Sequence, residues 1–325
     1  MKKTLLLTYF VFFSLFFVPK LLKYSPLPQI DEQVQESARP VAAVSAKQDV
    51  PNLISVSHDG QTVAMDMDEY LLGVLAAEMP ASFPEEALKA QAVAARTFAM
   101  YCTAASKHGE AQVCTDFACC QAWQDDAQLR EKWGNDYDFY KAKLLSAISE
   151  TAGEYMDYEG QAIFAAFHSS SAGMTAACSE LWSELPYLQS VSSPESSETV
   201  PNYISIVDCA SIDFRDTLLH SAPYADFTGE ESTWLGECRR SESGRVESIS
   251  IGGVEFKGAE LRSLFALRSA AFELSYSEGT FRFTVTGYGH GIGMSQYGAK
   301  VFADEGSDYA AILAHYYQGA ELVRS

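Results

Sequence analysis

Apolar and polar positions alternate in some stretches of the chain and follow helical spacing in others. Alternation on either side of Asp59-Gly60 predicts a hairpin over residues 52–65, because a two-residue Asp-Gly turn suits antiparallel strands. Residues 245–251 and 281–285 alternate in the same way and predict two further strands. Since strands and helices come in runs and do not alternate strictly, the pattern predicts an α+β fold.

A first helix is predicted just after the hairpin. Asp66 or Asp68 can cap its N-terminus, and the apolar residues that follow continue to Glu78. Pro80 cannot continue a helix, so we expect this helix to end at Glu78.

Two more helices are predicted from spacing. Ser82 and Glu85 have the spacing of a capping box, and small or apolar residues recur at helical intervals through 88–102. The last part of the chain is expected to be helical around residues 310–317.

The N-terminal part has a different composition. Two lysines precede an uncharged run at residues 4–18 that is rich in Leu and Phe, and Lys20 follows it. We interpret residues 1–23 as a transmembrane signal anchor in which Lys20 snorkels, with a cleaved signal peptide as the alternative. Residues 24–52 hold four prolines and predict a flexible linker, which leaves one extracytoplasmic domain over 53–325.

Composition and charge narrow the class of protein. The chain has 325 residues, 47% of them hydrophobic, which is enough to form a substantial core. Its net charge of −20 repels phosphate backbones and argues against nucleic-acid binding. The seven cysteines are odd in number, so at least one stays unpaired within the chain.

Several common motifs are absent from the sequence: the Walker A loop, H-E-x-x-H and G-x-S-x-G. Glycines recur at every second position over 287–293, which does not match a dinucleotide-binding fingerprint. Such spacing indicates a loop whose backbone closely approaches either a ligand or a neighbouring strand.

Two stretches of sequence are specific enough to identify a family. Residues 70–97 include Ala-Ala-Glu-Met-Pro and residues 287–299 include Gly-His-Gly-Ile-Gly-Met-Ser-Gln-Tyr-Gly. Together with blocks at 167–173 and 244–269, they resemble the stage II sporulation protein D family over nearly the whole of residues 53–320.

The resemblance implies a lytic transglycosylase. Such enzymes cleave the bond between N-acetylmuramic acid and N-acetylglucosamine in peptidoglycan glycan strands, prefer denuded glycan, and leave 1,6-anhydro-muramic ends. The resemblance also implies a role in forespore engulfment, with an amidase and a membrane scaffold as partners. The protein would then sit in the mother-cell membrane by a single anchor, with its catalytic domain outside the cytoplasm.

The family's catalytic glutamate corresponds to Glu78. The residue follows an apolar helix turn, and apolar surroundings raise the pKa of a carboxyl group, as a general acid requires. Glu78 would protonate the glycosidic oxygen and then accept a proton from the muramic C6 hydroxyl. Because that hydroxyl is the nucleophile, no second carboxylate is needed, unlike in ordinary glycoside hydrolases.

Polar residues elsewhere in the matching blocks are candidates for contact with the glycan. Arg96 can instead orient Glu78 or form a structural ion pair, and a Ser/His triad is a weaker interpretation of the serines near His168. The substrate-binding candidates are Gln91, Arg96, His168, Ser169, Ser171, His290, Gln296 and Tyr297.

The cysteines depart from the family pattern. Some members carry Cys-x4-His-Cys here and bind zinc through the first Cys and the His, whereas this chain has Cys119 at the histidine position. Cys114 and Cys119 can still bind zinc, with further ligands from elsewhere, such as His168 or water. A disulfide within the cluster of Cys114, Cys119 and Cys120, or free thiols, are the alternatives to zinc. A separate disulfide between Cys209 and Cys238 is also considered.

Two other functions remain as hypotheses. One is a non-catalytic wall-binding or amidase-enhancing module, since such domains share the Gly-rich C-terminal block. The other is a two-carboxylate hydrolase in which Asp66, Asp68 or Glu85 assists Glu78.

Overall fold

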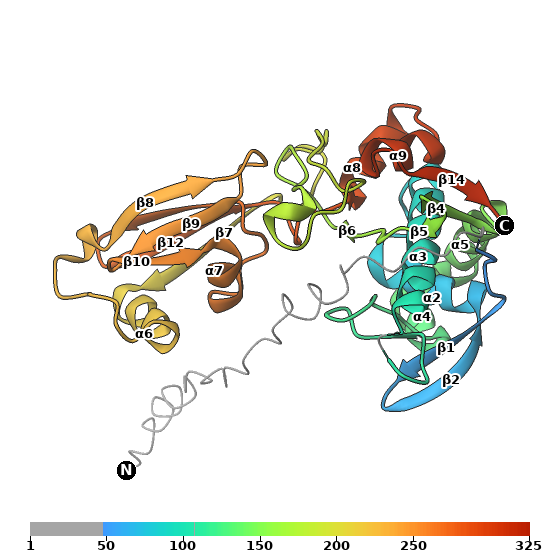
Figure 1. Cartoon of the computed structure of the whole chain (residues 1–325), viewed down its shortest axis with the longest axis horizontal. Helices are drawn as coiled ribbons and strands as arrows, with labels where there is room; N and C mark the ends of the chain where they lie inside the picture. Colours follow the sequence, from blue (N-terminus) through green and yellow to red (C-terminus); the bar gives the residue numbers. More distant parts are fainter. Residues whose placement is uncertain (1–47, 107) are drawn as a thin grey trace, which may run out of the picture.

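A computed structural model describes residues 48–106 and 108–325 (Figure 1). The predicted anchor over 1–23 and most of the predicted linker over 24–52 lie outside the described residues. Within the part that is described, we find no helix with the length and apolar character needed to cross a membrane.

The chain builds two lobes, each with its own hydrophobic cluster (Figure 1). The first lobe contains both ends of the described chain, because the C-terminal strand pairs with a strand from its middle. Its elements are β1 (Leu53–His58), β2 (Gln61–Asp66), α2 (Met67–Glu78), α3 (Glu85–Ala105), β3 (Val113–Cys114), α4 (Asp126–Trp133), α5 (Tyr137–Glu150), β4 (Glu154–Tyr158), β5 (Gln161–Ala162), β6 (Phe167–His168), β13 (Met294–Ser295), α8 (Gln296–Asp304), α9 (Tyr309–Tyr316) and β14 (Glu321–Arg324).

The second lobe is formed by the segment between residues 204 and 286. It contains two antiparallel three-stranded sheets, ordered β10-β9-β8 and β11-β12-β7. Its elements are β7 (Ile204–Ala210), α6 (Ser211–Ser221), β8 (Leu235–Arg240), β9 (Val246–Ile251), β10 (Val254–Lys257), α7 (Gly258–Leu264), β11 (Phe272–Ser277) and β12 (Thr280–Thr286).

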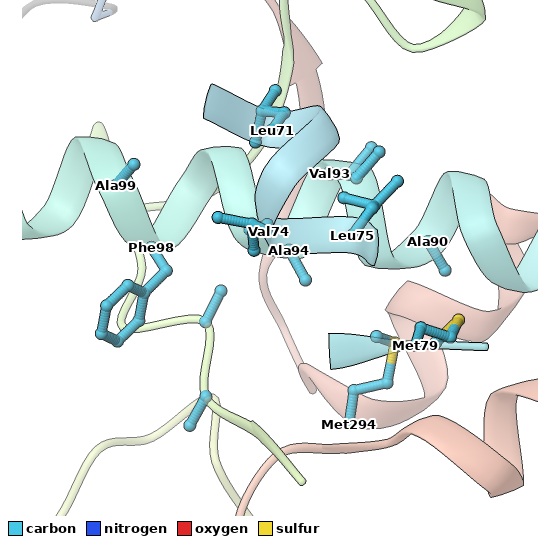
Figure 2. Close-up of a cluster of buried hydrophobic side chains, with 14 of the residues drawn as sticks. Leu71, Val74, Leu75, Met79, Ala90, Val93, Ala94, Phe98, Ala99 and Met294 are labelled. Carbon is cyan, nitrogen blue, oxygen red and sulfur yellow. The ribbon is translucent and has the colours of Figure 1, made fainter. Parts of the chain in front are cut away.

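The first-lobe core is built around α2 and α3. Both helices are apolar or small on nearly every side, so they are buried on most of their surface. Figure 2 shows Val74 and Leu75 of α2 beside Val93 and Ala94 of α3, with Met294 reaching the same cluster from β13. The small residues of α3 let the neighbouring elements approach closely, which fixes the end of α2 relative to the rest of the lobe.

Most of the predicted elements are confirmed. Asp59 and Gly60 have positive φ and join β1 to β2, and Asp66 caps α2 by accepting from the Asp68 N–H at 2.9 Å. The fold is α+β, as the pattern predicted.

The predicted capping box of α3 does not form. The helix begins later than the box requires, because Pro84 is its N-cap residue and Glu85 is already its first residue. Glu85 forms an ion pair with Lys89 instead. A rigid proline in extended conformation starts this helix without a side-chain cap.

Candidate functional site

A cavity of about 620 Å³ opens between the two lobes. The first lobe provides the end of α2, Phe98 of α3, and the segments around residues 117–121 and 164–169. The second lobe provides α7 and the residues after it, from 262 to 268, and the loop at 288–290 closes one side. The size is typical of a ligand-binding cleft.

Glu78 is the last residue of α2 and its side chain lines the cavity. The helix stops there because Met79 is extended and is followed by a proline. Burial raises the pKa of Glu78 from its ordinary value of 4.5 to about 7, although hydrogen bonds from Ala122 and Gln296 favour the ionised form. Ala122 N–H donates to Glu78 Oε1 at 2.8 Å, so one carboxyl oxygen is held in place.

A buried polar network supports Glu78 from the C-terminal block. Gln296 lies between Glu78 and Gln91, with its amide nitrogen 3.4 Å from Gln91 Oε1. The preceding residue, Ser295, donates to the buried carboxylate of Glu195. Glu195 also accepts from the backbone and hydroxyl of Ser171, at 2.6 and 2.7 Å. Glu195 therefore ties the two sequence blocks together behind the cavity.

Two histidines lie side by side in the cavity wall, with ring centroids 5.7 Å apart. Burial, and then the nearby Arg245 and Arg262, lower the pKa of His168 to about 4, with only Glu195 and a backbone carbonyl acting in the opposite sense. The pKa of His290 is lowered too, first by burial and then by His168 and the same arginines. Both rings are therefore neutral at pH 7.

The Gly-rich segment 287–293 packs tightly against the strand segment 166–171. A Cβ at Gly293 would meet the Ala166 carbonyl oxygen at 2.0 Å, and one at Gly287 would meet the Ser170 oxygen at 2.7 Å. Both glycines also have positive φ. Of the two explanations for the spacing, close packing against a neighbouring strand is the one the structure supports.

The predicted substrate-binding residues separate into two groups. His168, Ser169, His290 and Gln296 line the cavity. The others stand behind it or elsewhere: Gln91, Arg96, Ser171 and Tyr297.

Arg96 has a structural role, because it binds backbone carbonyl groups. Its guanidinium is buried and donates to the backbone oxygens of Glu154 and Ile148 at 3.1 and 3.3 Å. The side chain does not line the cavity, and it satisfies carbonyl groups where α5 leads into β4.

The aromatic and cationic residues of the cavity are not among the candidates predicted from the sequence. Phe117 and Tyr288 are exposed aromatic faces at the cavity, and Trp182 packs against His290 with centroids 5.2 Å apart. Arg262 and Arg268 belong to the other lobe. Tyr288, Arg262 and Arg268 fall within blocks that resemble the family, but the blocks do not indicate which of their residues reach the cavity, because only the tertiary fold brings them there.

The second carboxylate that a two-carboxylate hydrolase would need is not found beside Glu78. Asp66 and Asp68 lie at the opposite end of α2, and Glu85 is exposed and paired with Lys89. Among the described residues that line the cavity, Glu78 is the only carboxylate. This disfavours the two-carboxylate hypothesis.

Three cysteines and one histidine gather beside the cavity. The ligand atoms of His108, Cys114, Cys119 and Cys120 all lie within 4.8 Å of one another, and His108 Nε2 is 3.1 Å from the Cys120 sulfur. Sulfur and imidazole donors in this number suit a tetrahedral zinc site. A zinc ion held by Cys114 and Cys119 would take His108 and Cys120 as its further ligands, whereas His168, the further ligand considered from the sequence, does not belong to this group.

The disulfides considered from the sequence do not form. All seven cysteines are unbridged. Cys209 lies on β7 and Cys238 on β8, in two different sheets, so nothing in the strand pairing brings them together.

Known proteins are similar to this chain, and the similarity includes the segment that carries Glu78. A family model described as stage II sporulation protein matches residues 57–158, which include Glu78 and the cysteine cluster. Stage II sporulation protein D of Bacillus amyloliquefaciens is 35% identical over 277 residues, covering 84% of this chain and 78% of that protein. The protein of the same name from Bacillus subtilis (strain 168) is 35% identical over 261 residues, covering 79% of this chain and 74% of that protein.

A relative with a different name also matches. The amidase enhancer of Bacillus subtilis (strain 168) is 28% identical over 305 residues, covering 78% of this chain and 40% of that protein. The two Bacillus sporulation proteins match at higher identity and over most of both chains, which shows the family. The chain belongs to the stage II sporulation protein D family.

Proposed function

We propose that the protein is a peptidoglycan lytic transglycosylase in which Glu78 is the catalytic acid and base. One observation supports this most strongly. Glu78 has a pKa raised to about 7 and is the lone carboxylate among the described lining residues of a cleft large enough for sugar rings. A mechanism with a single carboxyl group fits an intramolecular nucleophile better than an attacking water.

Each step uses the same carboxyl group. Protonated Glu78 gives its proton to the glycosidic oxygen as the bond to muramic C1 breaks, and N-acetylglucosamine leaves with a free C4 hydroxyl. The carboxylate then takes the proton of the muramic C6 hydroxyl, whose oxygen bonds to C1. The proton returns to Glu78, no water is added, and the product ends in 1,6-anhydro-muramic acid.

The neighbours of Glu78 hold its carboxyl group in position for both proton transfers. The Ala122 N–H fixes one oxygen, and the Gln296 amide, itself backed by Gln91, forms a second hydrogen bond to the carboxyl group. Phe117 offers an exposed aromatic face on which a sugar ring can stack.

Digestion of denuded glycan followed by mass spectrometry tests the proposal. We expect anhydro ends from the wild type and a loss of about 10²–10⁴-fold in rate for Glu78→Gln, the range for removing a general acid and base. Glu85→Gln, an exposed carboxyl one helix away, is the matched control and should keep its rate. Incorporation of water oxygen at the new end would instead establish a hydrolase.

We also propose that His108, Cys114, Cys119 and Cys120 hold a zinc ion. When bound by four protein ligands, zinc contributes folding energy. The cluster would then fix the segment that carries Cys120 and, two residues on, the Ala122 N–H that binds Glu78. The metal content of the purified protein tests this: we expect one zinc per chain, lost in Cys114→Ser and kept in Cys209→Ser.

The amidase-enhancer relative supports a second candidate, a module that binds the wall and stimulates an amidase. It predicts glycan binding and amidase stimulation by both wild type and Glu78→Gln, with no anhydro product from either. For the transglycosylase we also propose action in forespore engulfment, a membrane anchor, and an amidase and a scaffold as partners. The names of the sporulation relatives support the role in sporulation.

A further inference from the structure

We propose that Arg262 and Arg268 form a subsite for the free lactyl carboxylate of a muramic acid residue. This inference rests on the proposed function, because it takes the ligand of the cleft to be peptidoglycan glycan. The second lobe would then distinguish glycan that carries a free carboxylate next to the sugar ring from glycan that does not.

The local charge of the cavity differs from that of the whole molecule. The chain carries a net charge of −20, yet the described lining contains two arginines and a single carboxylate, Glu78. That carboxyl group has a raised pKa and is protonated in the form that starts the reaction. A cleft with this balance attracts an anionic group although the rest of the surface repels anions.

The cationic groups of the cavity are the arginines and not the histidines. His168 and His290 both have lowered pKa values, so at neutral pH they offer hydrogen bonds without charge. Arg262 lines the same cavity as both rings, and its charge is one of those that lower their pKa. The positive charge of the cleft is therefore concentrated on the second-lobe side.

One of the two arginines is already oriented. The Arg268 guanidinium lies 4.4 Å from the centroid of the Tyr288 ring, and its Nη1 donates to the Asn202 oxygen at 2.8 Å. The side chain is only partly buried and lines the cavity. A guanidinium fork held in this way matches a carboxylate in two hydrogen bonds.

The chemistry of the glycan then decides what the subsite recognises. Muramic acid carries a lactyl ether at C3 that ends in a carboxylate when the stem peptide has been removed. A stem peptide turns that group into a neutral amide and moves its own carboxylates several atoms away from the ring. A chitooligosaccharide has the same sugar backbone and no lactyl group at all.

Binding measurements in the inactive Glu78→Gln protein test the subsite, with three tetrasaccharides as probes. These are denuded glycan, the same glycan with stem peptides, and chitotetraose. We expect denuded glycan to bind about tenfold more tightly than chitotetraose, as a charge-assisted pair allows. Arg262→Gln and Arg268→Gln should each remove most of this preference and leave chitotetraose binding unchanged.

Further variants separate the subsite from general effects. Arg215→Gln removes the same charge from a surface ion pair on α6 and should leave the preference intact. Arg268→Lys keeps the charge without the fork and should retain part of the preference. Unchanged chitotetraose binding also reports that each variant is folded.

Equal affinity for denuded glycan and chitotetraose would overturn the subsite, and so would an equal loss for all three probes in the arginine variants. The proposed activity is judged separately, from anhydro ends made by the wild type. Anhydro ends without a carboxylate preference would reject the subsite alone, and a preference without anhydro ends would reject the enzyme alone.

Discussion

The two lobes contribute to the cavity in different ways. The first lobe provides a carboxyl group, neutral histidines and the cysteine cluster, all held by buried helices and by polar networks such as that of Glu195. The second lobe provides side chains from one short helix, α7, and from the residues that follow it. The matched family segment, residues 57–158, lies entirely in the first lobe.

The two lobes therefore hold different parts of the proposed site: Glu78 lies in the first lobe and the two arginines in the second. Glu78, the proposed catalytic residue, lies in the lobe with the larger core, where burial raises its pKa. The two arginines that are proposed to recognise the lactyl carboxylate stand on a lobe with its own core, to which both of its sheets contribute residues. Because the cores are separate, damage to one lobe should be measurable apart from damage to the other.

The largest expected effect comes from the second-lobe core. Phe214 is fully buried and stacks on Phe281 with centroids 3.9 Å apart, so Phe214→Ala should cost about 3–5 kcal/mol of stability. Hydrogen exchange should show the loss of protection in residues 204–286 and little change around α2 and α3. Equal loss in both lobes would mean that they unfold as one unit, while Phe139→Ala, an exposed position on α5, is the control.

A smaller effect, a gain in stability, is expected for Glu78→Gln. Its pKa rises from 4.5 unfolded to about 7 folded, so its contribution to stability is fully present below pH 4.5 and is lost as the pH rises through 7. Glu78→Gln should therefore gain stability over the wild type above pH 7, by at most about 3 kcal/mol. Urea unfolding at pH 5 and pH 8 measures the difference.

Glu150 gives the contrasting case on the surface of the same lobe. The hydrogen bond from Lys89 lowers its pKa, so its contribution is present above its ordinary range and is lost as the pH falls. Glu150→Gln should thus lose stability at neutral pH, where Glu78→Gln gains it. If the difference in stability between Glu78→Gln and the wild type did not change with pH, the Glu78 carboxyl group would not be desolvated in the folded protein.

Local signals in the sequence were enough to predict much of the first lobe. Asp59-Gly60 predicted the hairpin, Asp66 and Pro80 predicted both ends of α2, and the match around Glu78 indicated the catalytic candidate. Each of these depends on residues within a few positions of one another.

The rest of the site depends on contacts over long sequence distances. Glu195 lies 100 residues from Ser295, and Arg262 reaches the cavity only because the second lobe returns to the first. His108 joins the cysteines although the motif expected a histidine at position 119. Periodicity and spacing carry no information on such contacts, since they describe only neighbours along one element.

The smallest expected effect concerns two residues that were predicted to cap helices, Asp66 before Glu78 in the sequence and Ser82 after it. Asp66 accepts from the Asp68 N–H, so Asp66→Ala should cost about 1 kcal/mol, whereas exposed Ser82 caps nothing and Ser82→Ala should cost less than about 0.5 kcal/mol. Thermal unfolding of both variants measures this. The glycan-cleavage rate should stay unchanged in both, because the end of α2 at Glu78 is fixed by its packing on α3 and not by the cap twelve residues away. A fall in rate for Asp66→Ala that follows the loss of stability would show that the position of the carboxyl group depends on the whole helix.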